Sequence, residues 1–176
     1  MIKSKKEIDR MASAAAYAIN VNSYNVMQVF EDAFYESEDA FYERMYYLNK
    51  LFAYCYISSD NVGAWSETID DFIMDGMDLS VMNPREVAIF KNLPDNVTIY
   101  RGADKKEAKE GYGISWSLCP KVAKRFAFNH RNHKGETENR TVHKLTIPKH
   151  FISCYFGSRK EKEVLISSDW LAGELK

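Results

Sequence analysis

The chain has 176 residues, of which 45% are apolar and 28% charged, and its formal net charge is −1 at pH 7. This length and this balance are typical of a globular protein with one core or two small packed lobes. No apolar run approaches the roughly 18 to 20 residues that a membrane-spanning helix needs, and none follows the basic N-terminus, so the sequence predicts neither a membrane association nor a signal peptide.

The first half of the chain is predicted to be helical. Ser4 and Glu7 have the spacing of a capping box, in which each side chain bonds the backbone N–H of the other at the start of a helix. Apolar residues follow at helical intervals: Ile8, Met11, Ala15, Ala18 and Ile19. Segments 31–36 and 38–43 then repeat the same residues, but this echo is too short for a solenoid or a sustained coiled coil. It predicts one or two long helices with a buried stripe, formed by Phe34, Phe41, Met45, Leu48 and Phe52.

Two further helices are predicted before residue 93. Ser66 is placed to cap a helix whose apolar side is Ile69, Phe72 and Ile73. A short helix is predicted to start at Pro84, with the proline at the first helical position and an acidic residue in the first turn.

The pattern changes at the turn-forming segment 93–96. Alternating or β-rich segments predict five strands, over residues 97–101, 111–117, 141–147, 151–156 and 164–167. A short helix is predicted over 120–128, with inward-facing residues Val122, Ala123, Phe126 and Ala127, and a polar loop over 129–140. Helices followed by strands indicate an α+β protein. We therefore expect a helical lobe, residues 1–93, packed in one compact unit on a small mixed β-sheet core, residues 94–176.

Charge is distributed unevenly between these halves. Residues 1–93 hold 15 acidic and 8 Lys or Arg side chains, whereas residues 94–176 hold 10 and 16. A basic half would attract a pyrophosphate or a nucleic acid. The alternative is two solvated faces of opposite charge that also hold the halves together.

The three cysteines, Cys55, Cys119 and Cys154, are an odd number and lack metal-ligand spacing. They predict a reducing, cytoplasmic location rather than a disulfide framework. Each is expected to be a small buried residue, not a nucleophile.

Two motifs bring hydrogen-bonding side chains to predicted strands. Arg101 can fork onto a phosphate, and Gly102 after it lets a backbone or a ligand approach closely. Ser115 and Ser117 share one strand face, because side chains repeat every two residues there. Taken alone, the arginine motif is typical of a surface salt bridge, and the serine pair is typical of an edge strand with solvated hydroxyls.

A carboxylate pair follows late in the chain. Glu161 and Glu163 are expected to share one strand face at the edge of the strand predicted over 164–167. Alone, they are also typical of a solvated charge run. An arginine, a serine pair and a carboxylate pair together suit a dinucleotide whose glycosidic bond is to be broken.

In order and surroundings, these motifs resemble the Arg–Ser–Glu class of mono-ADP-ribosyltransferases, which includes the catalytic lobes of clostridial binary toxins and their phage-encoded relatives. The resemblance covers about residues 97–168. Trp116 departs from the Ser-Thr-Ser pattern usual in the family. The helical first half matches no motif, and a role like that of the toxins' helical lobe would rest on analogy.

The resemblance implies that NAD is the substrate and that Glu163 is the principal catalytic residue. Glu163 would bond the 2′-hydroxyl of the nicotinamide ribose and stabilise the oxocarbenium-like cation as the bond to nicotinamide breaks. Glu161 would orient or deprotonate the acceptor, and a glutamate at this position implies an arginine acceptor. Ser115 and Ser117 would bond the ribose and hold the catalytic carboxylate in place. Arg101, next to Gly102, would contact a phosphate or ribose of NAD.

The resemblance also extends to flanking residues. Phe126 would stack on nicotinamide, or else it belongs to the core. Arg131 would contact the pyrophosphate, and the segment 155–157 resembles an aromatic turn that reads the protein acceptor. His130 and His133 lack a third ligand, so they are expected to be solvated or close to phosphate and not to bind zinc.

The expected function is mono-ADP-ribosyl transfer from NAD to a protein side chain, with arginine as the implied acceptor, release of nicotinamide and no metal. Such an enzyme would be an effector or toxin of phage or bacterial type, acting in the cytoplasm of the producing or infected host cell. Three alternatives stay open: an NAD glycohydrolase, an ADP-ribosyltransferase acting on nucleic acid, and a non-catalytic inhibitor that binds a partner through the acidic helical half.

Overall fold

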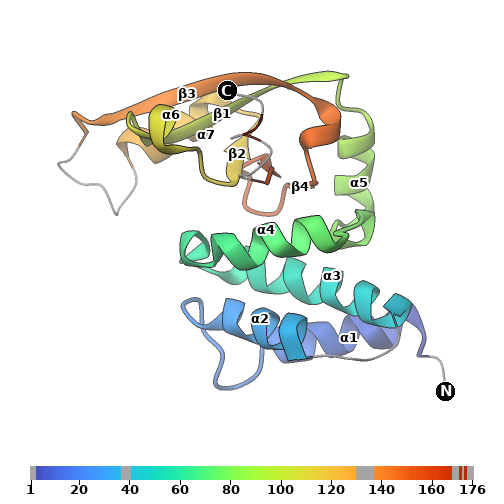
Figure 1. Ribbon diagram of the computed structural model, residues 1–176. Coiled ribbons are helices and arrows are strands. Elements are labelled where there is room, and N and C mark those ends of the chain that lie inside the picture. Colours follow the sequence, from blue (N-terminus) through green and yellow to red (C-terminus); the bar gives the residue numbers. More distant parts are fainter. Residues whose placement is uncertain (1–2, 37–40, 130–136, 168–170, 172, 174–176) are drawn as a thin grey trace. The chain divides into compact units, whose positions relative to one another are not determined.

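The computed structural model describes residues 3–36, 41–129, 137–167, 171 and 173 (Figure 1). It confirms an α+β architecture with most helices before the strands. The chain divides into two compact units, Met1–Asn83 and Pro84–Lys176. The sequence placed this division after residue 93. Helix α5 (Pro84–Lys91) instead belongs with the sheet, because it packs against strand β4 (Cys154–Phe156).

The elements described in the N-terminal unit are all helices or 3-10 turns, joined by short loops. Its elements are α1 (Lys5–Ala16), α2 (Val26–Glu36), α3 (Phe41–Ser58), the 3-10 turn η1 (Val62–Trp65), α4 (Ser66–Asp75) and the 3-10 turn η2 (Leu79–Val81). The capping box is confirmed: the Ser4 hydroxyl accepts from the Glu7 N–H at 3.3 Å, and the Glu7 carboxylate accepts from the Ser4 N–H at 2.8 Å. Ser66, by contrast, is the first helical residue of α4 and does not cap it.

The predicted apolar side of the first helix is partly wrong. Ile8 is buried, but Met11 and Ile19 are 45% and 99% exposed. Helix α1 ends at Ala16, and the chain then turns: the backbone N–H of Ala18 donates to the Ala15 carbonyl at 3.4 Å, and that of Val21 donates to the Ala18 carbonyl at 2.9 Å. Residues beyond Ala16 therefore do not continue the helical stripe.

Aromatic rings form the core of the N-terminal unit. The ring centroids of Phe30, Phe52 and Phe72 lie 5.0 to 5.2 Å apart, at spacings that favour aromatic pairs. Phe34 and Leu48 are buried with them, as predicted. Met45 is half-buried, and the side chain of Phe41 lies outside the described residues.

The C-terminal unit holds the sheet. After α5 its elements are β1 (Asn96–Asp104), α6 (Glu107–Glu110), β2 (Ser115–Ser117), α7 (Pro120–Phe128), β3 (Arg140–Pro148), the 3-10 turn η4 (Lys149–Phe151), β4 (Cys154–Phe156) and β5 (Glu163–Leu165). Within the described residues the sheet has five strands in the order β3-β1-β2-β5-β4. The long strands β1 and β3 run side by side (Figure 1).

Every strand pair in this part of the chain is antiparallel, so the expectation of a mixed sheet is wrong. For β4 and β5 the reason is connection length, because a parallel pair needs a crossover of about a dozen residues or more, whereas only residues 157–162 join these two strands. The described residues contain no helix that is long and apolar enough to cross a membrane.

Three predicted strands are shorter than expected, and one helix has the predicted bounds. The segment 111–117 forms a strand only from Ser115, and its first residue, Gly111, instead caps the end of α6 with φ at 110°. The segment 151–156 begins with η4, and the last strand spans Glu163–Leu165, not 164–167. Helix α7 is confirmed over Pro120–Phe128.

Gly102 explains how α7 lies on the sheet. A Cβ atom there would lie 1.9 Å from the Ala123 carbonyl oxygen and 2.5 Å from the Ala127 nitrogen, so only glycine allows the helix backbone to touch β1. Ala123 and Ala127 are buried as predicted, but Val122 and Phe126 are half-buried because they flank this contact line.

Candidate active site

A serine and a glutamate meet across the pair β2–β5. The Ser115 hydroxyl donates a hydrogen bond to Oε1 of Glu163. In the register of the sheet, Ser115 lies opposite Leu165, and Glu163 lies opposite Ser117. The contact is therefore diagonal, between side chains on one face of the sheet. Both residues are half-buried, so the carboxylate is fixed in orientation yet reachable.

Ser117 has a different role in the structure. Its hydroxyl donates to the backbone carbonyl of Glu161 at 2.6 Å and accepts from the backbone N–H of Cys119 at 3.0 Å. It is only 5% exposed. Ser117 thus ties β2 to the turn before β5, which positions the residues on either side of it.

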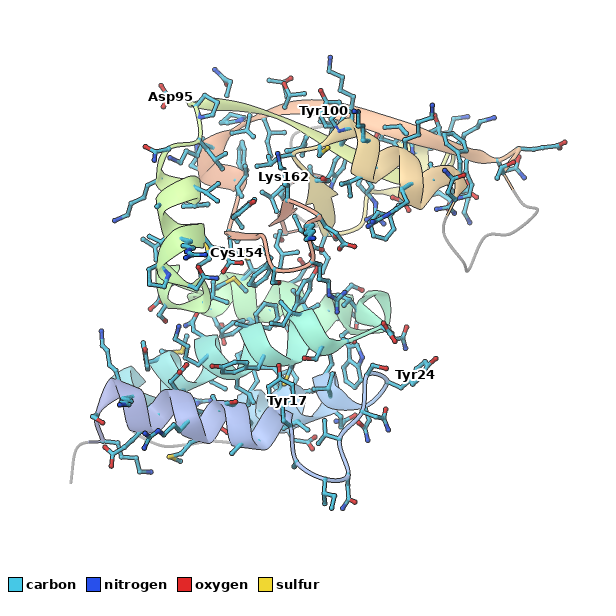
Figure 2. All side chains as sticks on the ribbon, turned by 180° about the vertical axis from the view of Figure 1, so that it is seen from behind. Tyr17, Tyr24, Asp95, Tyr100, Cys154 and Lys162 are labelled. Carbon is cyan, nitrogen blue, oxygen red and sulfur yellow. The ribbon has the colours of Figure 1, made fainter. Side chains whose placement is uncertain are left out.

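Glu161 lies in that turn, so the prediction that Glu161 and Glu163 share a strand face is wrong. Strand β5 begins at Glu163. Lys160 and Lys162 have φ values of 57° and 48°, and such left-handed conformations break the strand on both sides of Glu161. Lys162 is labelled in Figure 2. The Glu161 carboxylate instead faces α7 and accepts from Nη2 of Arg125 at 2.7 Å.

Arg101 bonds protein groups through all three nitrogens of its guanidinium. Its Nε and Nη2 donate to the carboxylate of Glu107 at 2.6 and 3.2 Å, and its Nη1 donates to the carbonyl oxygen of Ser115 at 2.8 Å. Gly113 makes room for this arrangement, because a Cβ atom there would lie 2.4 Å from Nη2. The fork of the guanidinium, predicted to hold a phosphate, holds a carboxylate here.

The sheet register also separates two predicted site residues. Tyr100 lies opposite Ser117, and side chains alternate along each strand. Arg101 therefore belongs to the sheet face of Trp116, and Ser115 to the other face. The Arg101 guanidinium contacts Ser115 through its backbone, not through its hydroxyl.

The remaining predicted residues are placed as follows. Phe126 is half-buried on α7, and the Arg125 guanidinium lies 5.0 Å from its ring centroid. Gly102 serves the contact between α7 and β1 described above. Arg131, His130 and His133 lie outside the described residues.

The predicted aromatic turn is partly a strand. Tyr155 and Phe156 belong to β4 and are each 4% exposed. Only Gly157 lies in the turn, where its N–H donates to the buried carboxylate of Glu86 at 2.8 Å. Glu86 was noted in the sequence only as a first-turn residue of its helix, since nothing local points to a contact 71 residues away.

The cysteines differ in environment. Cys55 and Cys154 are buried as predicted. Burial raises the pKa of the Cys154 thiol well above its ordinary value, and the nearby charges of Glu163 and Glu86 add to this effect. Cys119 is half-buried at the start of α7, where the backbone N–H of Val122 lowers the pKa of its thiol.

Sequence reasoning missed three charged partners, Glu107, Arg125 and Glu86, which belong to charge-rich or helical segments with no motif of their own. Among the described residues, no group of three or more His, Cys, Asp or Glu side chains could hold a metal ion.

Comparison of the chain with protein-family models, with curated proteins and with solved structures found no match. The interpretation of the site therefore depends on the residues themselves and on the geometry given above.

Proposed function

We propose that this protein is a mono-ADP-ribosyltransferase that cleaves NAD at the nicotinamide–ribose bond and transfers ADP-ribose to a protein side chain, with arginine as the acceptor. The observation that carries the proposal is the hydrogen bond from Ser115 to Glu163. It matches the role expected of the serine, which is to hold the catalytic carboxylate in place.

Glu163 has the properties that this chemistry needs. Departure of nicotinamide leaves positive charge on the ribose C1′, and a fixed carboxylate stabilises such a cation, as in glycoside hydrolysis. A carboxylate that is already oriented does not have to reorganise during the reaction. Ser115 supplies that orientation from β2, and the strand pairing β2–β5 supplies the distance.

Binding of the NAD phosphates requires a change around Arg101. Its fork is paired with Glu107, which is 22% exposed and lies on the short helix α6. A phosphate is bound by the same bidentate geometry as a carboxylate. Arg101 and Glu163 belong to opposite faces of the sheet, so we propose that NAD passes the start of the short strand β2 at Ser115. A phosphate of NAD then takes the place of the Glu107 carboxylate, while the bond from Arg101 to the Ser115 carbonyl is kept.

An NAD glycohydrolase is the second candidate, and one observation favours it. The carboxylate expected to receive the acceptor, Glu161, already accepts from Arg125. If that ion pair persists in the presence of NAD, the Glu161 carboxylate is not available to deprotonate a protein acceptor, and water becomes the acceptor.

Incubation of the protein with NAD labelled in the adenylate part, together with a cell lysate, distinguishes these functions. Label in protein, removed by a treatment specific for arginine-linked ADP-ribose, supports the proposed function. Label only in free ADP-ribose supports the glycohydrolase, and label in RNA or DNA supports the nucleic-acid acceptor. If NAD stays intact, the result supports the remaining alternative, a non-catalytic inhibitor. Glu163→Gln is the matched control for any activity in the lysate itself.

A further inference from the structure

Arg125 lies between two residues that the site is predicted to use. Its Nη2 is 2.7 Å from Oε1 of Glu161, and its guanidinium lies 5.0 Å from the ring centroid of Phe126. Glu161 is the carboxylate expected to receive the guanidinium of an arginine acceptor, and Phe126 is the ring expected to stack on nicotinamide. An arginine of the chain itself thus contacts both Glu161 and Phe126.

The ion pair of Arg125 contributes little to stability. The Arg125 side chain is 51% exposed, whereas that of Glu161 is 17% exposed. Ion pairs with an exposed partner contribute roughly 0 to 1 kcal/mol. The terminal nitrogen nevertheless points at one particular carboxylate oxygen, and the exposure leaves room on the solvent side of the guanidinium.

Glu161, the partner of Arg125, is close in sequence to the proposed catalytic residue Glu163. Glu161 and Glu163 are two residues apart, so their Cα atoms are separated by at most about 7 Å. The residue that binds Arg125 is therefore a near neighbour of the proposed catalytic carboxylate.

We infer that Arg125 is an acceptor of the enzyme's own reaction, so that the protein ADP-ribosylates itself on this arginine. The inference rests on the proposed function. The bond between C1′ of the ribose and the nicotinamide nitrogen breaks, and its electron pair leaves with neutral nicotinamide. Nη2 of Arg125 forms the new bond to C1′, and the proton that it loses passes to the carboxylate of Glu161. No further co-reactant is needed.

The test uses the purified full chain and adenylate-labelled NAD, with no other protein present. Mass spectrometry of proteolytic fragments is expected to place ADP-ribose on Arg125, and the fraction labelled per minute should not depend on enzyme concentration, since the reaction is intramolecular. Nicotinamide release and labelling of an added small guanidino compound are measured in parallel.

Variants make the assignment specific. Arg125→Lys should lose the label at this position, whereas Arg10→Lys, the same substitution at an exposed site of the N-terminal unit, should keep it. Glu161→Gln should lower the ratio of Arg125 label to nicotinamide released by about 10² or more, the scale of a lost general base. Thermal unfolding of each variant checks that it is folded.

The outcomes separate the two proposals. Nicotinamide release with label on the guanidino compound, but none on Arg125, would overturn the inference and leave the proposed function standing. Labelling whose rate per molecule rises with enzyme concentration would overturn the intramolecular assignment. Absence of nicotinamide release would overturn both proposals.

Discussion

The Ser115 hydroxyl reaches the Glu163 carboxylate diagonally across two strands whose directly opposed pairs are Ser115–Leu165 and Ser117–Glu163. The two serines thus have separate tasks: the first holds a carboxylate, and the second holds backbone. Both hydroxyls lie on the same face of β2, because side chains alternate along a strand. Their different hydrogen-bond partners therefore distinguish the two serines.

Ser115→Ala is expected to slow nicotinamide release about 10- to 100-fold, because a hydrogen bond to a charged group contributes about 1.5–3 kcal/mol and each 1.36 kcal/mol of barrier is about tenfold in rate. The rate is measured with saturating NAD. Ser117→Ala is the matched control: it removes two backbone contacts of a buried hydroxyl and should lower the free energy of unfolding by about 1–3 kcal/mol. Equal rates for Ser115→Ala and wild type would contradict the role given to Ser115.

Gly102→Ala should destabilise the C-terminal unit by about 3 kcal/mol or more, the upper range for overpacking. The reason is the 1.9 Å approach of the added Cβ to the Ala123 carbonyl, a backbone atom that cannot rotate away. Urea unfolding measures the effect. Gly63→Ala, with open space around its Cβ position, should change the stability little. A Gly102→Ala protein as stable as Gly63→Ala would show that α7 does not rest on β1 as described.

Arg101→Lys should both weaken NAD binding and destabilise the C-terminal unit. Lysine keeps the charge but cannot bond Glu107 twice and the Ser115 carbonyl once, because it lacks the planar fork. Calorimetry with NAD and urea unfolding measure the two effects. An unchanged affinity for NAD together with a lowered stability would contradict a role in binding. Arg101 would then only stabilise the loop between β1 and β2.

Cys55 gives the stability of the protein a dependence on high pH. Burial raises the pKa of its thiol from 9.0 to about 12. A raised pKa in the folded state means that the stabilisation is complete below the pKa of the unfolded chain and is lost as the pH rises toward the folded value. Between pH 9 and 12 the loss is about 1.4 kcal/mol per pH unit.

Cys55→Ala removes this component, so its free energy of unfolding should fall less steeply with pH in that range. The contributions of Cys154 and of the tyrosines are common to both proteins. Urea unfolding at several pH values compares the slopes, and identical slopes would contradict the burial of an uncharged thiol at this position.

Local signals in the sequence predicted the parts of the fold that depend on them. The capping box of Ser4, the proline starts of α5 and α7, and the strand alternation after residue 96 are all properties of a few neighbouring residues. The turn that holds Glu161 had no such signal, because its left-handed residues are lysines and not glycines. The alternation of Glu161 and Glu163 therefore predicted a shared strand face.

The candidate site was predicted only in part, for a related reason. Arg101, Ser115 and Glu163 belong to recognisable motifs, and the structure brings the last two together. Their charged partners come from elsewhere: Glu107 from a helix of a single turn and Arg125 from α7. Such pairings depend on how the chain folds back on itself, so a reading of neighbouring residues does not find them.

Nicotinamide release from NAD by the wild-type protein and by Glu163→Gln tests the central claim most directly. Glutamine keeps the shape of the side chain and an oxygen for the Ser115 hydroxyl, but it lacks the charge that stabilises the ribose cation. We expect release by the wild type and a rate lower by 10²–10³, about 2.7–4 kcal/mol, in the variant, with the same free energy of unfolding. No release by the wild type, or equal release by both proteins, would contradict the assignment of Glu163 as the catalytic carboxylate.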